Sequence, residues 1–248
     1  MKPHLIFSRH QYADTILRHE FTNTFDELLS ALESVDVPLN PAGPFSSVKT
    51  GSRPKTPKRH MVNKKHNRYL LKPIAQKEWN AALDKTLRDL HWASQPIAIT
   101  DTKAKQTKQK GDFAKDGIFV EVEFGNVASA HRDMLKFLVS HDRGTARVGV
   151  LACMVQRMTK LADSNLTAFE TVNRTILPFL RLTPMPILFI GLDYRDSDEH
   201  ILRSHYDDMY AVATENGVNC LTSDEVFKNP EFLLTEDSLD DDDSDDID

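Results

Sequence analysis

The sequence lacks several features that define whole classes of protein. Only two of its 248 residues are cysteines, and it contains no uninterrupted apolar run of the roughly 18 residues that a membrane-spanning helix needs. A disulfide-rich scaffold and a transmembrane helix are therefore excluded. Arg9 and His10 interrupt the short apolar stretch at the start, so we expect no signal peptide. Cys153 and Cys220 lie in apolar contexts, which predicts buried thiols in a reducing compartment rather than a metal site.

The acidic charge is concentrated at one end of the chain. Hydrophobic residues make up 40% of the sequence, enough for a folded core, and the formal net charge is -6. Residues 236–248 carry nine acids and no base, so residues 1–235 have a net charge of +3. A segment of this kind buries little apolar area and repels itself. We expect one mildly basic domain over residues 1–235, followed by a disordered acidic tail over residues 236–248.

Residues 38–72 read as an insertion or arm that is first rich in proline and then basic. Five prolines between residues 38 and 57 disfavour regular structure there. Residues 49–72 contain nine Lys or Arg and no acid, including Lys64, Lys65 and Arg68. The segment is either a solvated loop or an arm that orders on DNA, and we favour the arm because cations without acids suit phosphate contacts. Residues 103–110 form a second basic stretch without acids.

The rest of the chain alternates between helical and extended patterns. Spacings of three and four predict helices, and short apolar runs predict strands. The predicted helices cover about residues 10–35, 76–92, 127–141, 166–180 and 198–215, and the predicted strands cover about 112–124 (a hairpin), 146–155 and 186–194. Strands separated by helices indicate an α/β fold with a mixed sheet.

The hairpin brings acidic residues together. Asp116-Gly117 is a strong signal for a two-residue turn, because both central residues of such a turn need positive φ. With that turn, Asp112 falls opposite Glu121, and Lys110 falls opposite Glu123. Alternate residues of a strand share a face, so Asp112, Glu121 and Glu123 converge on one face of the hairpin.

Three converging carboxylates repel each other unless opposite charge offsets them. A hard divalent cation such as Mg²⁺ does so with oxygen ligands, and it can activate a water for attack on a phosphodiester. The alternative is a solvent-exposed acidic strand face paired with Lys110 and Lys115. The basic segments on both sides of the hairpin favour a metal site for a polyanionic phosphate substrate.

At these residues the sequence resembles the restriction endonucleases of the BglII and BamHI type, within the PD-(D/E)xK nuclease superfamily. The segment "DFAKDGIFVEVEFGN" carries the resemblance, and "HQYADTIL" and "PILFIGL" extend it to roughly residues 10–215. Glu123 stands where most of the superfamily has Lys, and Gln or Glu at this position is the pattern of the BglII and BamHI branch. The resemblance implies a restriction-endonuclease-like fold, with a mixed central sheet flanked by helices.

The resemblance also implies an activity and a set of residue roles. Asp112 and Glu121 would be metal ligands, and Glu123 would position or deprotonate the attacking water. The family has an Asn or Glu on an upstream helix, and Glu78 is our candidate for it, although its spacing to Asp112 is longer here. Lys110 and Lys115 would contact the scissile phosphate, or else are ordinary exposed charges. Lys64, Lys65 and Arg68 are further candidates for DNA contacts.

Such enzymes are homodimers that cut both strands of a palindromic duplex with Mg²⁺, for which Mn²⁺ is expected to substitute. The family cuts sites with a GATC core, and a cognate DNA methyltransferase is expected in the cytoplasm of the same prokaryotic host. The helix at 127–141 would pair with its copy in the dimer or pack on its own sheet. Two other functions stay open: a DNA-binding protein that has lost catalysis, and a repair nuclease on the same fold.

Overall fold

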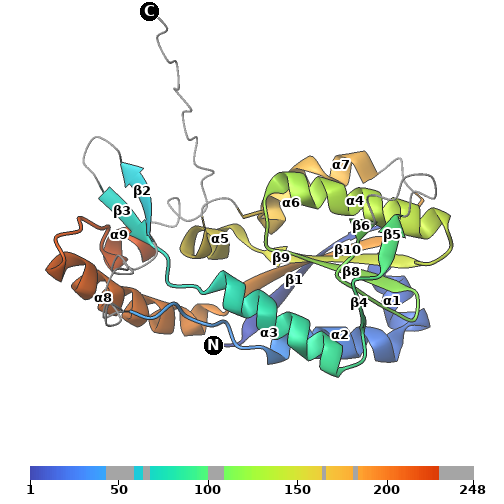
Figure 1. Ribbon diagram of the computed structural model, residues 1–248, viewed down its shortest axis with the longest axis horizontal. Helices are drawn as coiled ribbons and strands as arrows, with labels where there is room; N and C mark the ends of the chain where they lie inside the picture. The colour runs from blue at the N-terminus through green and yellow to red at the C-terminus, as the bar shows by residue number, and fades with distance from the viewer. Residues whose placement is uncertain (43–58, 64–67, 100–108, 164–165, 181–183, 229–248) are drawn as a thin grey trace, which may run out of the picture.

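A mixed six-stranded sheet forms the centre of the computed structural model, which describes residues 1–42, 59–63, 68–99, 109–163, 166–180 and 184–228 (Figure 1). The strand order is β1-β10-β9-β8-β7-β4. Strands β8, β9 and β10 run parallel to one another, while β1 pairs antiparallel with β10, and β7 pairs antiparallel with both β8 and β4. The six strands are β1 (Pro3–His10), β4 (Ala93–Ser94), β7 (Phe113–Lys115), β8 (Ile118–Glu123), β9 (Val148–Met154) and β10 (Ile187–Tyr194).

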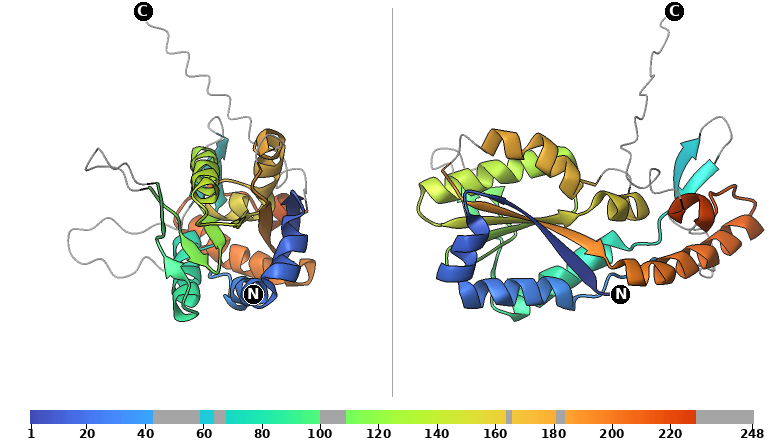
Figure 2. Two further views of the ribbon diagram at one scale, coloured as in Figure 1. Left: turned by 90° about the vertical axis from the view of Figure 1, so that its right-hand side faces the viewer. Right: turned by 180° about the vertical axis from the view of Figure 1, so that it is seen from behind.

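Helices cover both faces of this sheet (Figures 1 and 2). On one face lie α1 (Ala13–Glu20), α2 (Thr22–Ser34) and α3 (Gln76–Asp89), and on the other lie α4 (Val127–Asp142), α6 (Phe169–Thr175) and α7 (Leu177–Leu180). Short α5 (Gln156–Ala162) follows β9. This arrangement confirms the predicted mixed central sheet flanked by helices.

A second group of elements lies beyond one end of the sheet (Figure 1). It consists of α8 (Glu199–Glu215), α9 (Ser223–Phe227) and the antiparallel pair β2 (Arg59–Asn63) and β3 (Arg68–Leu71). A short 3-10 helix (Asp196–Asp198) precedes α8, and a two-stranded ribbon of β5 (Ile97–Ile99) and β6 (Gln109–Lys110) precedes the hairpin. None of the helices in the described part of the chain has the length and apolar character to cross a membrane.

The parallel strands form the most deeply buried part of the core. Every residue of β9 and β10 is buried, as expected for strands covered by helices on both faces. Trp79, Leu83 and Leu87 recur every four residues along α3 and are fully buried, which explains why this segment is helical and which of its faces meets the core.

The predicted hairpin is confirmed over its turn and its first pairs. Asp116 and Gly117 both have positive φ, at 51° and 88°, and Lys115 pairs with Ile118 as the turn requires. The β7–β8 pairing ends at Phe113 and Val120. The predicted pairing of Lys110 with Glu123 is wrong, because Lys110 pairs with Ile97 in the separate β5–β6 ribbon.

Several predicted boundaries also differ from the structure. The helix expected over 10–35 is two helices separated at Phe21, and the chain up to His10 is the edge strand β1. The helix expected over 166–180 divides at Ile176, two residues before Pro178, whose ring nitrogen has no N–H to donate. Part of the basic segment forms β2 and β3, which the sequence analysis did not predict.

The proline-rich residues 43–58 and the acidic tail, residues 236–248, lie outside the described residues, so those two predictions are untested.

Candidate active site

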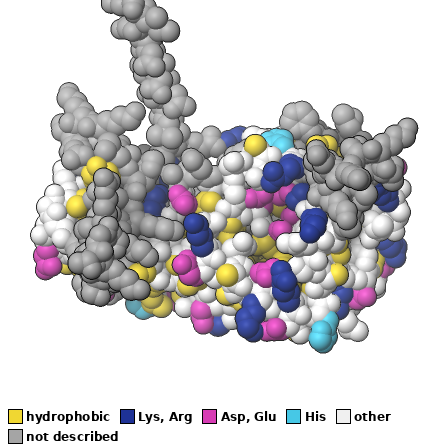
Figure 3. Space-filling view, viewed as in Figure 1, with side chains coloured by type: hydrophobic (Ala, Val, Ile, Leu, Met, Phe, Trp, Pro, Cys, Tyr) yellow, Lys and Arg dark blue, Asp and Glu magenta, His cyan; other side chains and the backbone are white. Residues whose placement is uncertain are grey.

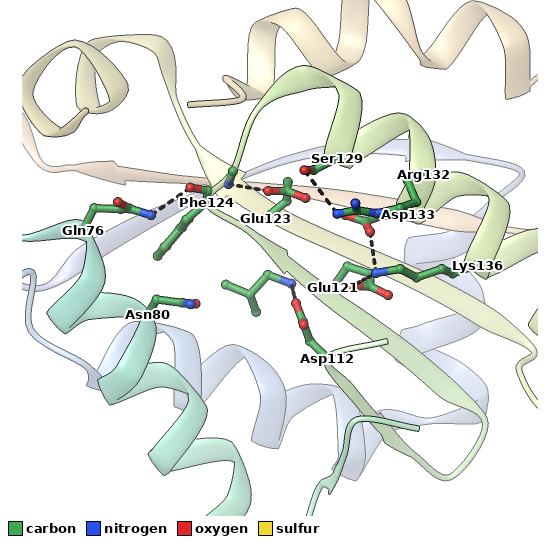
Figure 4. A pocket seen from close by; sticks show the side chains of 12 residues that line it. Gln76, Asn80, Asp112, Glu121, Glu123, Phe124, Ser129, Arg132, Asp133 and Lys136 are labelled. Carbon is green, nitrogen blue, oxygen red and sulfur yellow. Dashed lines mark hydrogen bonds and ion pairs between the residues drawn. The ribbon is translucent and has the colours of Figure 1, made fainter. Parts of the chain in front are cut away.

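The converging carboxylates line an open pocket of about 260 Å³ between β8, α3 and α4 (Figure 4). On this face of the molecule acidic side chains lie close to basic ones below α4 (Figure 3). The lining residues are Gln76, Asn80, Asp112, Glu121, Val122, Glu123, Phe124, Gly125, Ser129, Arg132, Asp133 and Lys136.

Asp112 is held beside β8 although it is no longer part of the strand ladder. Its carboxylate Oδ2 accepts a 2.9 Å hydrogen bond from the Val122 N–H, and its carbonyl oxygen accepts one from the Gln95 N–H, also at 2.9 Å. Glycine at position 111 allows the chain to pass close to Phe119, because a Cβ there would lie 2.2 Å from the Phe119 ring. The structure therefore brings Asp112 next to the strand that carries Glu121 and Glu123, as the hairpin predicted.

Glu121 and Glu123 lie on the face of β8 that α4 covers. Phe119 shares this face, and its ring meets Phe137 of α4 edge-on at 5.8 Å. Glu121 is only 1% exposed and Glu123 only 8%. The alternative of a solvent-exposed acidic strand is therefore wrong. The opposite face of β8 is apolar, as predicted, with Ile118, Val120 and Val122 buried.

Helix α4 contributes two charged side chains that the sequence analysis missed. Asn126 caps the helix, since its side chain accepts the Ser129 N–H, and this fixes where the helix begins. Asp133 and Lys136 are one turn apart, so they share the face turned toward β8. The Lys136 ammonium lies 3.1 Å from Glu121 Oε2 and 2.6 Å from Asp133 Oδ1. The sequence signal that could have found Asp133 and Lys136 is their three-residue spacing in the helix that follows the acidic strand.

Burial and crowding shift the pKa values of these groups. Burial, with the charges of Asp133 and Asp112, raises the pKa of Glu121 to about 9. Burial and a hydrogen bond to Asp133 raise the pKa of Glu123, and burial raises the pKa of Asp112. Burial opposes the charge on Lys136, but Asp133 and Glu121 raise the pKa of its ammonium overall. The pocket is thus lined by four acids and two cations, an imbalance that a divalent ion would correct.

The oxygen atoms in the pocket suit a hard divalent cation. Oε1 of Glu121 is buried and has no hydrogen-bond partner among the described residues, so one carboxylate oxygen is available for a ligand. In the same described part of the chain, no three His, Cys, Asp or Glu side chains are grouped closely enough to hold an ion by themselves. Asp112 and Glu121 fit a cation that completes its shell with waters and substrate phosphate, which is how Mg²⁺ is usually bound.

Helix α3 closes the other side of the pocket, and it does so with different residues from the one predicted. Gln76 and Asn80 line the pocket, and Gln76 Nε2 donates a 2.8 Å hydrogen bond to the Phe124 carbonyl (Figure 4). Glu78 is exposed and does not line the pocket. Residues two apart on a helix point in widely different directions, whereas residues four apart share a face. Of these two residues, Asn80 lines the pocket and Glu78 does not.

The predicted lysine contacts also lie elsewhere. Lys115 Nζ pairs with Glu27 at 2.6 Å and donates to the Leu90 carbonyl, and Lys110 Nζ donates to Gln95. Neither lysine lines the pocket. The cations that do so come from α4: the buried Lys136 and the exposed Arg132 at the rim.

Of the three candidates for DNA contacts in the basic segment, the structure describes Arg68 alone. Arg68 lies in β3, where its guanidinium pairs with Glu225 of α9 at 2.6 Å, and it does not line the pocket. Lys64 and Lys65 lie outside the described residues.

Comparisons with known proteins show similarity in sequence and in fold. Residues 5–192 match the family model described as restriction endonuclease BglII/BglIII. A crystal structure of BglII complexed with a DNA 16-mer is similar, with 14% identity, a TM-score of 0.55 and 77% of each chain covered. The structure of free BglII is similar with 16% identity and a TM-score of 0.50, covering 77% of this chain and 80% of that one. No curated protein sequence matches the chain.

Proposed function

The chain belongs to the BglII/BglIII family of restriction endonucleases, which makes it a type II site-specific deoxyribonuclease, and we propose that it hydrolyses both strands of a palindromic DNA site with Mg²⁺. A GATC core is the proposed centre of that site. The observation that carries the proposal is the convergence of Asp112, Glu121 and Glu123 in one pocket beside a cation-bearing helix.

Two of the carboxylates are proposed to hold the metal. Asp112 is oriented through Val122, and Glu121 presents a free buried oxygen, so both are suited to ligate Mg²⁺, or Mn²⁺ in its place. A divalent cation bound there would polarise a phosphoryl oxygen and acidify a water.

Glu123 is proposed to take the proton from the attacking water. Its Oε1 accepts the Gly125 N–H, which fixes the carboxylate in the pocket. The raised pKa of Glu123 brings the carboxylate nearer to neutral pH, as a general base needs. The water oxygen then forms a bond to phosphorus, and the bond from phosphorus to the departing ester oxygen breaks.

Arg132 and Asn80 are proposed to position the substrate. Arg132 is exposed at the rim and donates to Ser129 Oγ at 3.3 Å, so its guanidinium is directed along the pocket entrance. Arginine binds phosphate oxygens with two parallel hydrogen bonds, which suits it to the DNA backbone next to the cut. Asn80 reaches the same pocket from α3 and offers both a donor and an acceptor.

A second copy of the chain is the proposed partner, because two sites related by a two-fold axis are needed to cut both strands of a palindrome. Leu135 of α4 is 56% exposed, and Ala128, seven residues earlier on the same face, is also exposed. Both positions suit contact with the same helix of the partner subunit. A cognate DNA methyltransferase in the cytoplasm of a prokaryotic host completes the proposal.

Digestion of plasmid and phage DNA with the purified protein, with and without Mg²⁺, tests the function. Discrete fragments that appear only with Mg²⁺ support it, and sequencing the cut ends identifies the site. Binding without cutting would favour a protein that has lost catalysis, and cutting confined to damaged or branched DNA would favour a repair nuclease.

A further inference from the structure

Lys136 is a buried lysine inside an acidic pocket. Its side chain is 9% exposed, and those of its two carboxylate partners, Glu121 and Asp133, are each 2% exposed. Lysine is almost never buried to this extent unless it is paired, because removing an ammonium from water is costly. Here the two carboxylates that offset this cost lie in the pocket that carries the candidate metal ligands.

The contacts of Lys136 are selective among the carboxylates. Its ammonium reaches Oε2 of Glu121 and Oδ1 of Asp133. Glu123 is instead oriented by the Gly125 N–H, and Asp112 by the Val122 N–H. Lys136 thus contacts Glu121 through Oε2 alone, and Glu121 Oε1 has no hydrogen-bond partner among the described residues.

We propose that Lys136 is a positioning residue of the nuclease site, which holds Glu121 by Oε2 so that Oε1 faces the metal, and which is itself held by Asp133. The inference rests on the proposed function. Where the wider superfamily places a lysine on the strand, this chain has Glu123, and the ammonium enters the site from α4, thirteen residues further along the sequence.

This arrangement has an electrostatic consequence that a purely structural ion pair does not have. The ammonium and a bound divalent cation share one carboxylate and repel each other. Removing the ammonium should therefore strengthen cation binding, while Glu121 loses the contact that orients it. Tighter metal binding together with slower cleavage distinguishes positioning from a loss of folding, which would weaken both.

The test compares Lys136→Met with the wild-type protein. Calorimetric titration with Mn²⁺ in the absence of DNA should give a dissociation constant about fivefold lower in the variant. Cleavage at saturating Mn²⁺ should be slower by roughly 30-fold or more, which is the order expected when a catalytic group loses its alignment. Lys136→Arg keeps the charge, so it should recover part of the cleavage rate and bind Mn²⁺ as the wild type does.

Arg157→Met provides the matched control. Arg157 also makes a partly buried ion pair, with Asp193 at 2.8 Å, but it does not line the pocket. This substitution should lower the melting temperature and leave the Mn²⁺ dissociation constant unchanged.

Two results would overturn the inference. One is unchanged Mn²⁺ binding and cleavage in Lys136→Met, and the other is a parallel loss of Mn²⁺ binding, cleavage and melting temperature. If Lys136→Met does not fold, the arginine variant decides: slower cleavage with wild-type Mn²⁺ binding supports positioning, and a parallel loss of Mn²⁺ binding, cleavage and melting temperature would exclude it. Failure of the wild-type protein to bind Mn²⁺ or cut DNA would count against the proposed function instead.

Discussion

Asp112 accepts the Val122 N–H at 2.9 Å, so its side chain takes the place of a backbone acceptor where the β7–β8 ladder has already ended. Val122 lies between Glu121 and Glu123 in the strand. The contact therefore fixes the distance between the carboxylate of Asp112 and those two residues without a continuous strand pair. It also leaves the other oxygen of Asp112 free of this hydrogen bond, and that oxygen suits a metal ion.

Asp112→Asn and Glu121→Gln should each reduce cleavage by at least about 100-fold while retaining specific DNA binding, because phosphate and base contacts position the protein. In the Asp112→Asn variant the amide oxygen of the new side chain can still accept the Val122 N–H, so the local backbone should be preserved. Cleavage assays and electrophoretic mobility shifts with the same duplex measure the two properties. Near-normal cutting by either variant would remove that carboxylate from the proposed metal site.

Glu123→Lys should inactivate the enzyme, although it creates the commoner superfamily motif. The Gly125 N–H would lose its acceptor, and a second ammonium would enter a pocket that already contains Lys136. Cleavage should fall below detection while the circular dichroism spectrum is retained. Wild-type activity in this variant would show that position 123 does not act through its negative charge.

The metal-free protein should lose stability as the pH rises from about 4.5 to about 9. The pKa of Glu121 is raised to about 9 from an ordinary 4.5, and the pKa values of Asp112 and Glu123 are also raised. A carboxyl with a raised pKa favours folding below its ordinary value, and this contribution is lost as the pH rises through the raised value.

Melting curves in EDTA across this range measure the effect. Mg²⁺ or Mn²⁺ should restore the melting temperature most at the alkaline end, since an ion that binds only the folded state stabilises it. Glu121→Gln serves as the control and should show a shallower decline. An increase in stability over this window would contradict the assigned shifts.

The carboxylate cluster could be predicted from sequence because its geometry is local. The Asp116-Gly117 turn sets the register, and the alternation of a strand sets which residues share a face. The predicted register is wrong at Lys110 because the chain has left the central sheet there and pairs in the β5–β6 ribbon. The change occurs at the buried Gly111, a residue that contributes nothing to a hydrophobic pattern.

The charged residues of the helices could not be assigned in the same way. Lys136 and Glu121 meet only because α4 crosses the acid face of β8, and the crossing depends on packing between Phe119 and Phe137 rather than on sequence spacing. Similarly, the choice between Glu78 and Asn80 depends on the rotation of α3, which the burial of Trp79 and its contact with Phe124 determine.

Asn80→Ala should reduce cleavage about 10-fold or more, whereas Glu78→Ala on the same helix should leave it within about twofold, because surface changes away from a site are usually small. Of these two residues, only Asn80 lines the pocket. Alanine is at least as good a helix former as Asn or Glu, so neither substitution should disrupt α3. Equal effects of the two variants on the rate would place the upstream group somewhere other than α3.

Gly125→Ala should slow cleavage without unfolding the protein. A Cβ at position 125 would lie 2.5 Å from Glu123 Oε1 and 3.3 Å from Ser129 Oγ, so it must displace the Glu123 carboxylate. That carboxylate is the end of a flexible side chain, so moving it costs little folding free energy. The same movement misplaces the proposed base, and we expect a loss in rate of about 10-fold to 100-fold, because catalysis depends on alignment within about 1 Å. Mn²⁺ affinity and melting temperature should stay near wild-type values.

In a Glu123→Gln background the rate is already limited by the missing base, so adding Gly125→Ala should produce little further loss. Fully additive losses in the double variant would show that Gly125 acts through the backbone rather than through Glu123.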